Sequence, residues 1–371
     1  MTLRFSGLSF CAAALLAMLI AGCGSSDKPQ GDSGKAGTKR FIFIANGDDP
    51  YWDAANAGLI EGEKEFKCAD ANIKVVMEKN NGTAQGQIDK LRQFASQADV
   101  AGIALSAIQA DNAAIIEEVK NLTAKGVKVI TVDADVNIEK FPGARPYYIG
   151  TNNVVAGEVL GKAANALLKT RGVTEGGYVQ FAGFTDNDNA RSRMNGFESA
   201  VGKEYTQRDR MADEMDRSRA RDNVRNALNN HKDIVALVGI WAYNAPAIAE
   251  VVTERNVREK TAVVTFDAQP VAIENMGSGK IDAMVVQNPF EMGYLAVKLL
   301  KAMHEDDKKT IDEMFPNAGK PGGDVYTTGL RLVVPNADSP IKAENFDAKV
   351  VECMPLDQFQ EWLKKYKLTG S

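Results

Sequence analysis

The sequence of 371 residues has few of the side chains that build metal centres, with only four cysteines and two histidines. No two cysteines form a CxxC pair, which argues against a zinc site. Positive charge is not in excess either, because 44 Lys and Arg stand against 49 Asp and Glu. A protein that binds polyanions through phosphate contacts needs a basic excess, so nucleic acid is not an expected partner. Glycine and proline, at 32 and 12 residues, are too scarce for a collagenous or disordered chain.

Long apolar runs are also scarce, and the clearest one lies near the N-terminus. Residues 8–21 are almost wholly apolar and follow Arg4. The run is too short to span the ~30 Å hydrocarbon core of a membrane comfortably, but it suits the core of a signal peptide. It ends in Leu-Ile-Ala-Gly before Cys23, which resembles the signal of bacterial lipoproteins. We therefore expect a lipoprotein signal peptide over residues 1–22 and a lipid on Cys23. The alternative is a plain secretory signal in which Cys23 has no role.

The segment after this cysteine has the composition of a linker. Residues 24–38 contain no apolar residue larger than alanine or proline, so we expect a flexible tether over residues 23–38. The mature protein would then be exported and held in the periplasm or at the cell surface by its lipid alone. Cys68 and Cys353 would remain in an oxidising compartment, where they either pair or stay as two separate buried thiols.

From residue 40 onward, short apolar runs alternate with helical segments. The expected strands of a first series are residues 41–45, 73–77, 102–105, 128–132 and 147–150. Those of a second series are residues 178–181, 234–240, 262–266 and 283–286. Strands that are apolar throughout and alternate with helices are typical of parallel sheets covered on both faces. The fold class is therefore α/β, with two doubly wound lobes whose ligands bind at the carboxyl ends of the strands.

Polar and aromatic side chains gather after these strands. They include Asp49, Tyr51, Trp52, Ser106, Asp133, Thr151, Trp241, Asp267 and Gln287. Carboxylate and amide groups can each bind two neighbouring hydroxyls, and aromatic rings pack on the C–H faces of a sugar ring. The combination favours a neutral polyol as ligand. Taken singly, each Asp could instead cap a helix and each aromatic could belong to the core.

Six stretches, in order, resemble a known family. They are DDPYWDAANAG, KVITVDAD, YIGTNNVVAGEVLG, NARSRMNGF, VVTFDAQP and KIDAMVVQNPFEMGYLAVK. They are spread in order along residues 39–334, and this part of the chain resembles the periplasmic sugar-binding proteins of the ribose-binding type. These are the type I substrate-binding proteins of ABC importers.

The resemblance implies two Rossmann-like lobes joined by a three-segment hinge, with the ligand in the cleft between them. It implies crossovers near residues 150–151, 287–288 and 332–335. The first lobe would comprise residues 39–150 and 288–332, and the second residues 151–287 and 333–350. Residues 351–371 would form a C-terminal tail containing a helix, and we expect a disulfide between Cys68 and Cys353 to staple this tail to the first lobe.

The resemblance also implies a set of ligand contacts. They are Asp49, Tyr51, Trp52, Ser106, Asp133, Thr151, Arg191, Met215, Trp241, Asp267 and Gln287. The sequence departs from the ribose-type pattern at Ala134, where an arginine is usual, and at Asn152, where an aspartate is usual. With that arginine absent and Trp241 present, a different or larger pyranose suits the pattern as well as ribose does.

The expected function is to bind a neutral monosaccharide, as a monomer without cofactor or metal, and to deliver it to an ABC permease and its ATPase. The alternatives are a receptor that reports to a membrane sensor, or a binder of a polyol, nucleoside or autoinducer-like solute. An enzyme is not expected, because Asp133 and Asp267 would lie on opposite lobes and no water-activating partner accompanies them. A transcription regulator would have a helix-turn-helix where the signal peptide stands. The charged segment 208–225 is interpreted as a solvated face rather than a docking surface.

Overall fold

A computed structural model describes residues 37–49 and 51–371. The predicted signal peptide, Cys23 and most of the predicted tether lie outside the described residues. Within the described ranges, no helix is long and apolar enough to cross a bilayer.

The first lobe is built on a six-stranded sheet in the order β11-β5-β4-β3-β1-β2, with parallel pairing throughout. Its strands are β1 (Lys39–Ile44), β2 (Ile73–Glu78), β3 (Val100–Leu105), β4 (Lys128–Val132), β5 (Tyr148–Gly150) and β11 (Val325–Thr327). Its helices are α1 (Tyr51–Glu65), α2 (Ala84–Ala95), α3 (Ala113–Ala124), α9 (Pro289–His304) and α10 (Lys308–Met314).

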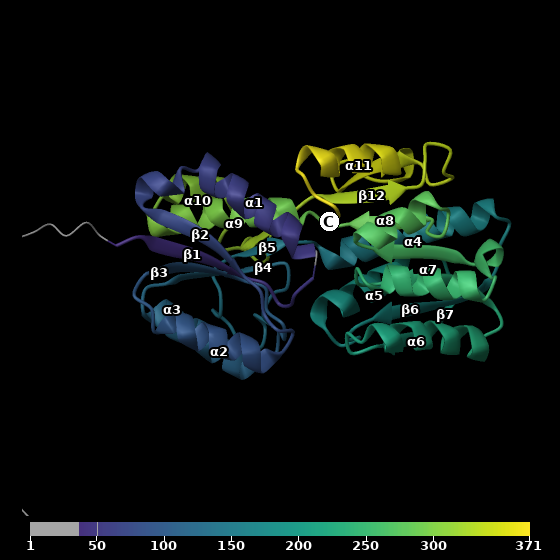
Figure 1. Ribbon diagram of the computed structural model, residues 1–371, viewed down its shortest axis with the longest axis horizontal. Helices are drawn as coiled ribbons and strands as arrows, with labels where there is room; N and C mark the ends of the chain where they lie inside the picture. Colours follow the sequence, from purple (N-terminus) through teal and green to yellow (C-terminus); the bar gives the residue numbers. More distant parts are fainter. Residues whose placement is uncertain (1–36, 50) are drawn as a thin grey trace, which may run out of the picture. The chain divides into compact units, whose positions relative to one another are not determined.

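Both faces of this sheet are covered, as its apolar strands require. Along β1, Phe41 and Phe43 pack in one core with α1 and α9, while Ile42 and Ile44 pack in another with α2 and α3. Figure 1 shows α1, α9 and α10 on one side of the sheet and α2 and α3 on the other. Alternate side chains of one strand therefore enter opposite cores, which explains why the strand is apolar at every position.

The second lobe is built on a seven-stranded sheet in the order β13-β12-β10-β9-β8-β6-β7. Its strands are β6 (Gly176–Ala182), β7 (Tyr205–Ala212), β8 (Ile234–Gly239), β9 (Ala262–Phe266), β10 (Ala283–Val286), β12 (Leu330–Val334) and β13 (Val351–Pro355). Its helices are α4 (Asn153–Thr170), α5 (Asp188–Ala200), α6 (Arg217–Asn230), α7 (Asn244–Glu254), α8 (Pro270–Gly277) and α11 (Leu356–Lys365). One core joins the sheet to α4 and α5, and another joins it to α6, α7, α8 and α11.

The chain passes between the two sheets three times. The first passage joins β5 to α4 and the second joins β10 to α9, close to the expected residues 150–151 and 287–288. The third joins β11 to β12 through residues 328–329, so the expected position at residues 332–335 was wrong. The chain leaves β10 and enters β12 at the same edge of the second sheet, the edge where the crossovers lie. β12 therefore runs antiparallel to β10.

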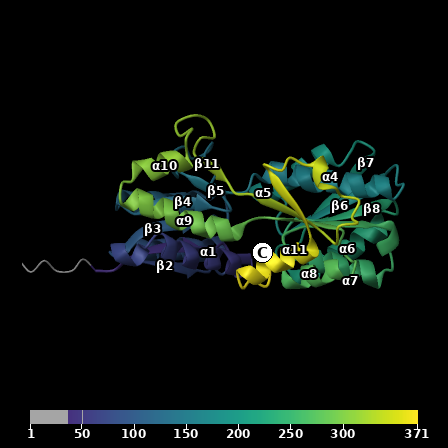
Figure 2. The ribbon, with the colours of Figure 1, turned by 90° about the horizontal axis from the view of Figure 1, so that it is seen from above.

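The C-terminal segment is part of the second lobe rather than a separate tail. β13 pairs with β12 in parallel, and Phe359 and Leu363 of α11 lie in the core beneath α7 and α8. Figure 2 shows α11 lying beside α8. The predicted boundaries at residues 332/333 and 350/351 were therefore wrong, although the helix within residues 351–371 is present.

The predicted disulfide is also absent, because Cys68 and Cys353 are both free thiols. Cys68 is buried in the core of the first lobe, at the 3-10 turn Cys68–Ala71 that follows α1. Cys353 lies on β13 and packs against a core of the second lobe. The predicted pairing failed because the segment carrying Cys353 belongs to the other lobe. Burial raises the pKa of the Cys68 thiol to about 11.

Part of the charged segment 208–225 is a strand that its sequence did not predict. β7 is the edge strand of the second sheet and pairs only with β6 among the described strands. Its Arg210 pairs with Glu198 at 2.8 Å, and Arg225 on α6 pairs with Glu254 at 2.7 Å. Charged side chains on an edge strand discourage pairing with other chains.

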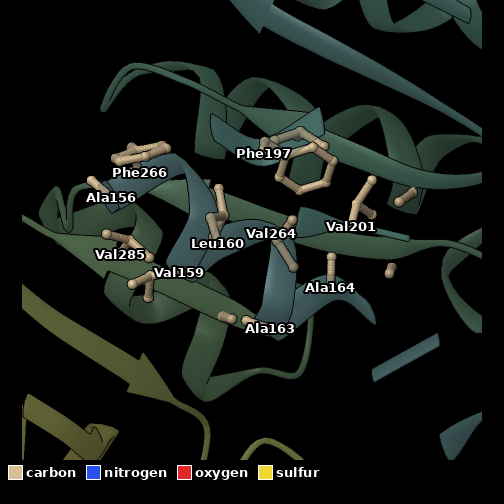
Figure 3. Packing of buried hydrophobic residues seen from close by; sticks show 14 of the residues in the cluster. Ala156, Val159, Leu160, Ala163, Ala164, Phe197, Val201, Val264, Phe266 and Val285 are labelled. Atoms are coloured by element: carbon tan, nitrogen blue, oxygen red, sulfur yellow. The ribbon is translucent and has the colours of Figure 1, made fainter. Parts of the chain in front are cut away.

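The backbones of α4 and α5 touch at two glycines. A Cβ atom at Gly157 would lie 2.1 Å from the carbonyl oxygen of Arg193, and one at Gly196 would lie 2.1 Å from that of Val154. Figure 3 shows the core on this side of the lobe, to which Leu160 and Ala163 of α4 and Phe197 of α5 belong. The close approach fixes the position of α5 relative to the sheet.

We expect Gly196→Ala to destabilise the protein by about 1–3 kcal/mol, because the added methyl group must push two backbones apart. Gly277→Ala at the end of α8 is the matched control, since its Cβ would lie 3.6 Å from the Leu356 Cδ2 atom. Urea unfolding followed by circular dichroism measures both variants. Equal unfolding midpoints for the two would contradict the close contact of α4 with α5.

Candidate functional site

A cavity of about 120 Å³ lies where strands of both lobes end. The first lobe contributes segments after β1, β3 and β4, and the second contributes segments after β6, β7, β8, β9 and β10. The lining residues are Asn46, Asp49, Tyr51, Trp52, Ile108, Asp133, Phe184, Asn187, Asn189, Arg193, Met215, Trp241, Ala242, Tyr243, Asp267 and Gln287. The volume is below the ~300–1,000 Å³ of sites for drug-sized molecules, and it suits a smaller ligand.

Most of the predicted contacts meet in this cavity. Those that line it are Asp49, Tyr51, Trp52, Asp133, Met215, Trp241, Asp267 and Gln287. They come together because each follows a strand whose carboxyl end faces the other lobe. Three predicted contacts do not line it: Ser106, Thr151 and Arg191.

Arg193, rather than Arg191, is the arginine of the cavity. Residues two positions apart lie about 200° apart around a helix, so the two side chains leave α5 in nearly opposite directions. The Arg191 side chain is 56% exposed and pairs with Asp188 at 2.8 Å, whereas the Arg193 side chain is 2% exposed. The prediction of Arg191 was therefore wrong, because the repeated arginines of NARSRMNGF did not show which one faced inward.

The Arg193 guanidinium is held from three sides. Its Nε atom donates to Asn153 Oδ1 at 3.0 Å, and its Nη1 atom donates to the Ile240 carbonyl at 3.1 Å. The group also lies over the Phe266 ring, 4.6 Å from its centroid. Across the described ranges no hydrogen-bond partner is found for Nη2, so this nitrogen remains free to donate to a ligand.

Asp133 is a buried carboxylate in a fixed orientation. Its Oδ1 atom accepts from the Tyr51 hydroxyl at 2.9 Å, and its Oδ2 atom accepts from the Ser106 hydroxyl at 3.1 Å. Burial raises the pKa of Asp133, while the Arg193 guanidinium and these two hydrogen bonds oppose the rise. Ser106 therefore lies behind Asp133 and orients it, rather than facing the cavity.

Asp267 is a second buried carboxylate, on the second lobe. Its Oδ1 atom accepts from Gln287 Nε2 at 3.0 Å, and its Oδ2 atom lies 3.9 Å from Arg193 Nη1. Burial raises the pKa of Asp267 to about 6, although Arg193 opposes the rise. Gln287 in turn accepts from the Thr151 hydroxyl at 2.9 Å. Thr151 thus connects the first crossover to the second instead of lining this cavity.

Aromatic side chains approach the cavity from both lobes. Tyr51 and Trp52 of the first lobe meet edge to face, with ring centroids 5.0 Å apart. On the second lobe, Trp241 lies edge to face with Phe184 at 6.1 Å, and its Nε1 atom donates to Asn189 Oδ1 at 3.1 Å. These rings provide apolar surfaces between the buried polar groups.

Several lining residues were not predicted. They are Asn46, Ile108, Phe184, Asn187, Asn189, Arg193, Ala242 and Tyr243. Phe184 and Tyr243 follow β6 and β8, so the rule that ligands bind at strand ends could have found them. Asn187 and Asn189 gave no such signal, because a sequence does not show how far the loop before α5 reaches.

One hydrogen-bonded contact joins the lobes directly beside the cavity. Gln269 Nε2 lies 3.0 Å from Asp49 Oδ1 and 2.9 Å from Asp49 Oδ2. Arg217 Nη2 lies 4.0 Å from the same carboxylate. Asp49 belongs to the loop after β1, whereas Gln269 precedes α8, so this contact holds the cavity partly closed.

The arrangement suits a ligand that is neutral and rich in hydroxyl groups. Two buried carboxylates face one buried guanidinium, so an anionic ligand would meet a net negative charge. Hydroxyl groups can donate to the carboxylates and accept from Arg193, while rings from both lobes cover the apolar faces of the ligand. Among the described residues, no group of three or more His, Cys, Asp or Glu side chains is placed to hold a metal ion.

Comparison with known proteins finds similar proteins both by sequence and by fold. The D-allose-binding periplasmic protein of Escherichia coli (strain K12) is 24% identical over 271 residues, which cover 71% of this chain and 84% of that protein. The fold matches GanP, a glucose-galactose binding protein from Geobacillus stearothermophilus, with a TM-score of 0.66, 24% identity, and coverage of 81% and 98% of the two chains. It also matches an ABC transporter solute binding protein from Burkholderia graminis C4D1M, solved with D-arabinose, with a TM-score of 0.68, 22% identity, and coverage of 84% and 98%.

These matches confirm the predicted α/β fold of two doubly wound lobes. The protein-family model described as "Periplasmic binding protein domain" matches residues 41–308 of the sequence. Membership of this family implies export to the periplasm, and because its members bind solutes, the prediction that the chain is not an enzyme is confirmed. The chain therefore belongs to the periplasmic binding proteins, as the resemblance to their ribose-binding type predicted.

Proposed function

We propose that the protein binds a neutral monosaccharide between its two lobes and delivers it to the permease of an ABC importer. The observation that carries the proposal is the cavity in which Asp133, Asp267 and Arg193 are buried between aromatic rings of both lobes. Each of the three polar groups keeps hydrogen-bonding capacity for a ligand, because Arg193 has its Nη2 donor and each carboxylate oxygen can accept more than one hydrogen bond. Hydroxyl groups of a sugar complement them without adding charge.

The names of similar proteins support a sugar as ligand. The similar proteins include one named for D-allose, one named for glucose and galactose, and one solved with D-arabinose. The ligands of these proteins are neutral monosaccharides of five or six carbons. A small neutral sugar is therefore the first class of ligand to test, ahead of a polyol, a nucleoside or an autoinducer-like solute.

The closed, sugar-bound protein has two candidate roles, transport and signalling. Transport requires a permease and an ATPase that recognise the closed protein, whereas a receptor would present the same closed form to a membrane sensor. Genes for an ATPase and a permease beside the gene for this protein would favour transport. A gene for a membrane sensor in their place would favour the receptor.

Arg193→Gln should abolish or strongly weaken sugar binding. The variant loses the free Nη2 donor and leaves two buried carboxylates without a cation, which we expect to weaken binding by about 2–5 kcal/mol, or roughly 30- to several-thousandfold. Arg191→Gln is the matched control on the same helix and should bind like the wild type. Titration calorimetry with pentoses and hexoses measures both. Equal losses in the two variants would contradict the assignment of Arg193, and failure of the wild type to bind any sugar would contradict the proposed function.

Affinity should fall as the pH is lowered through about 6, the raised pKa of Asp267. Below this pH the free protein holds a proton on Asp267, which a sugar hydroxyl must displace to donate to the ionised carboxylate. The dissociation constant should therefore rise about fivefold between pH 6 and pH 5. Calorimetry at a series of pH values measures this slope. Asp267→Asn should bind more weakly with a shallower slope, whereas an unchanged wild-type dissociation constant would exclude Asp267 as an acceptor.

We further propose that Cys23 carries a lipid that tethers the protein to a membrane. Radiolabelled palmitate added to expressing cells should label the wild type and leave Cys23→Ser unlabelled. Cys353→Ser is a suitable control, because this thiol lies within the folded second lobe. Label that persists on Cys23→Ser would mean that the lipid is attached elsewhere.

A further inference from the structure

A second cavity of about 310 Å³ adjoins the first. The two share Asp133, Asn187 and Asn189 as lining residues, so they meet at the carboxylate after β4 and at the first turn of α5. The second cavity extends from there toward the crossovers, where Thr151 and Thr327 line it. Its volume is larger than that of the cavity that holds Asp267 and Arg193.

One departure from the ribose-type sequence pattern enlarges the second cavity. Ala134, which stands where the ribose-type pattern has an arginine, lines the second cavity. Its methyl group leaves unfilled a volume that a long side chain would occupy. Nearby, Arg145 does not take the place of that arginine, because its guanidinium pairs with Asp135 at 2.6 Å and also with Asp324. The Arg145 side chain is only 1% exposed.

The polar groups of the second cavity suit hydroxyl groups. Asn153 uses its Oδ1 atom to accept from Arg193, and Asn189 uses its Oδ1 atom to accept from Trp241. In the described chain, the amide NH₂ groups of both residues and the Ser192 hydroxyl have no partner, so they are available to a ligand. The one arginine of this lining is neutralised by its carboxylate partners, and Asp133 adds negative charge, so phosphate or carboxylate substituents are disfavoured.

We propose that the ligand is a neutral disaccharide, with one ring in the cavity of Asp267 and Arg193 and the second ring in the cavity beside Ala134. This inference rests on the proposed function and extends its ligand from one neutral sugar ring, held in the cavity of Asp267 and Arg193, to two linked rings. Asp133 and Asn189 lie on the boundary and contact both rings, so the two cavities form a single site. Ala110 and Val325 line the part of this site that would hold the second ring.

The test compares neutral disaccharides with their component monosaccharides by titration calorimetry. The panel contains maltose, cellobiose, lactose and melibiose, together with glucose and galactose. At least one disaccharide should bind about tenfold more tightly than either component, because its second ring adds contacts that the monosaccharide lacks. Binding of monosaccharides together with weaker or absent binding of every disaccharide would overturn the inference while leaving the proposed function intact. Failure of every sugar to bind would overturn both.

Two variants locate the second ring. Val325→Trp should fold normally, because Val325 is 39% exposed, and it should fill part of the second cavity. Ala110→Trp places the same ring at another lining position of the second cavity and guards against an effect specific to Val325. Each should weaken disaccharide binding about tenfold or more and leave monosaccharide binding within about threefold.

Val271→Trp is the matched control, since Val271 is 51% exposed on α8 and lines neither cavity. It should leave both classes of sugar unaffected. If both cavity variants bind the disaccharide as tightly as the wild type does, the second ring lies elsewhere and the inference is overturned.

Discussion

The buried guanidinium of Arg193 is the group on which the site depends. It lies between a carboxylate of each lobe, and it opposes the rise in pKa that burial imposes on both Asp133 and Asp267. Without it, two buried carboxylates would face each other in a low dielectric, and at least one would hold a proton at neutral pH. The cation thus keeps the acceptors of the cavity ionised, while its stacking on Phe266 and its bonds to Asn153 and Ile240 hold it in place.

The surrounding fold positions the backbone of this arginine through a close contact between two helices. Gly157 lies against the Arg193 carbonyl, and Gly196 lies against α4, so α5 cannot approach or turn without a clash. At the crossovers, the Thr328 amide donates to the Gly150 carbonyl at 2.8 Å, and Thr151 bonds to Gln287. The same Gln287 orients Asp267, so the hinge and the binding site share a side chain. A change in the angle between the lobes is therefore transmitted directly to a ligand contact.

Much of this organisation could be predicted from the sequence. Apolar runs such as KVITV and AVVTF identified buried parallel strands, and the polar residues after them identified most of the cavity. The sequence could not show that β7 is a strand, because an exposed edge strand can be charged without loss of its hydrogen bonds. It could not choose between Arg191 and Arg193, since the phase of a helix is set by the partners that it packs against. The predicted disulfide failed for a related reason, because only the sheet topology shows to which lobe Cys353 belongs.

The three crossovers also determine when each lobe can fold during synthesis. The first lobe takes its opening strands from residues 39–150, but the helix that covers one face of its sheet, α9, begins at Pro289. Until the ribosome has made that helix, α1 alone packs on Phe41, Phe43 and the rest of that core, and the part covered by α9 stays exposed. One face of this sheet therefore stays partly uncovered while more than a hundred further residues are synthesised. The contacts that complete the lobe join distant parts of the chain and are slow to form. Such a chain exposes apolar surface for longer and so remains a substrate for chaperones.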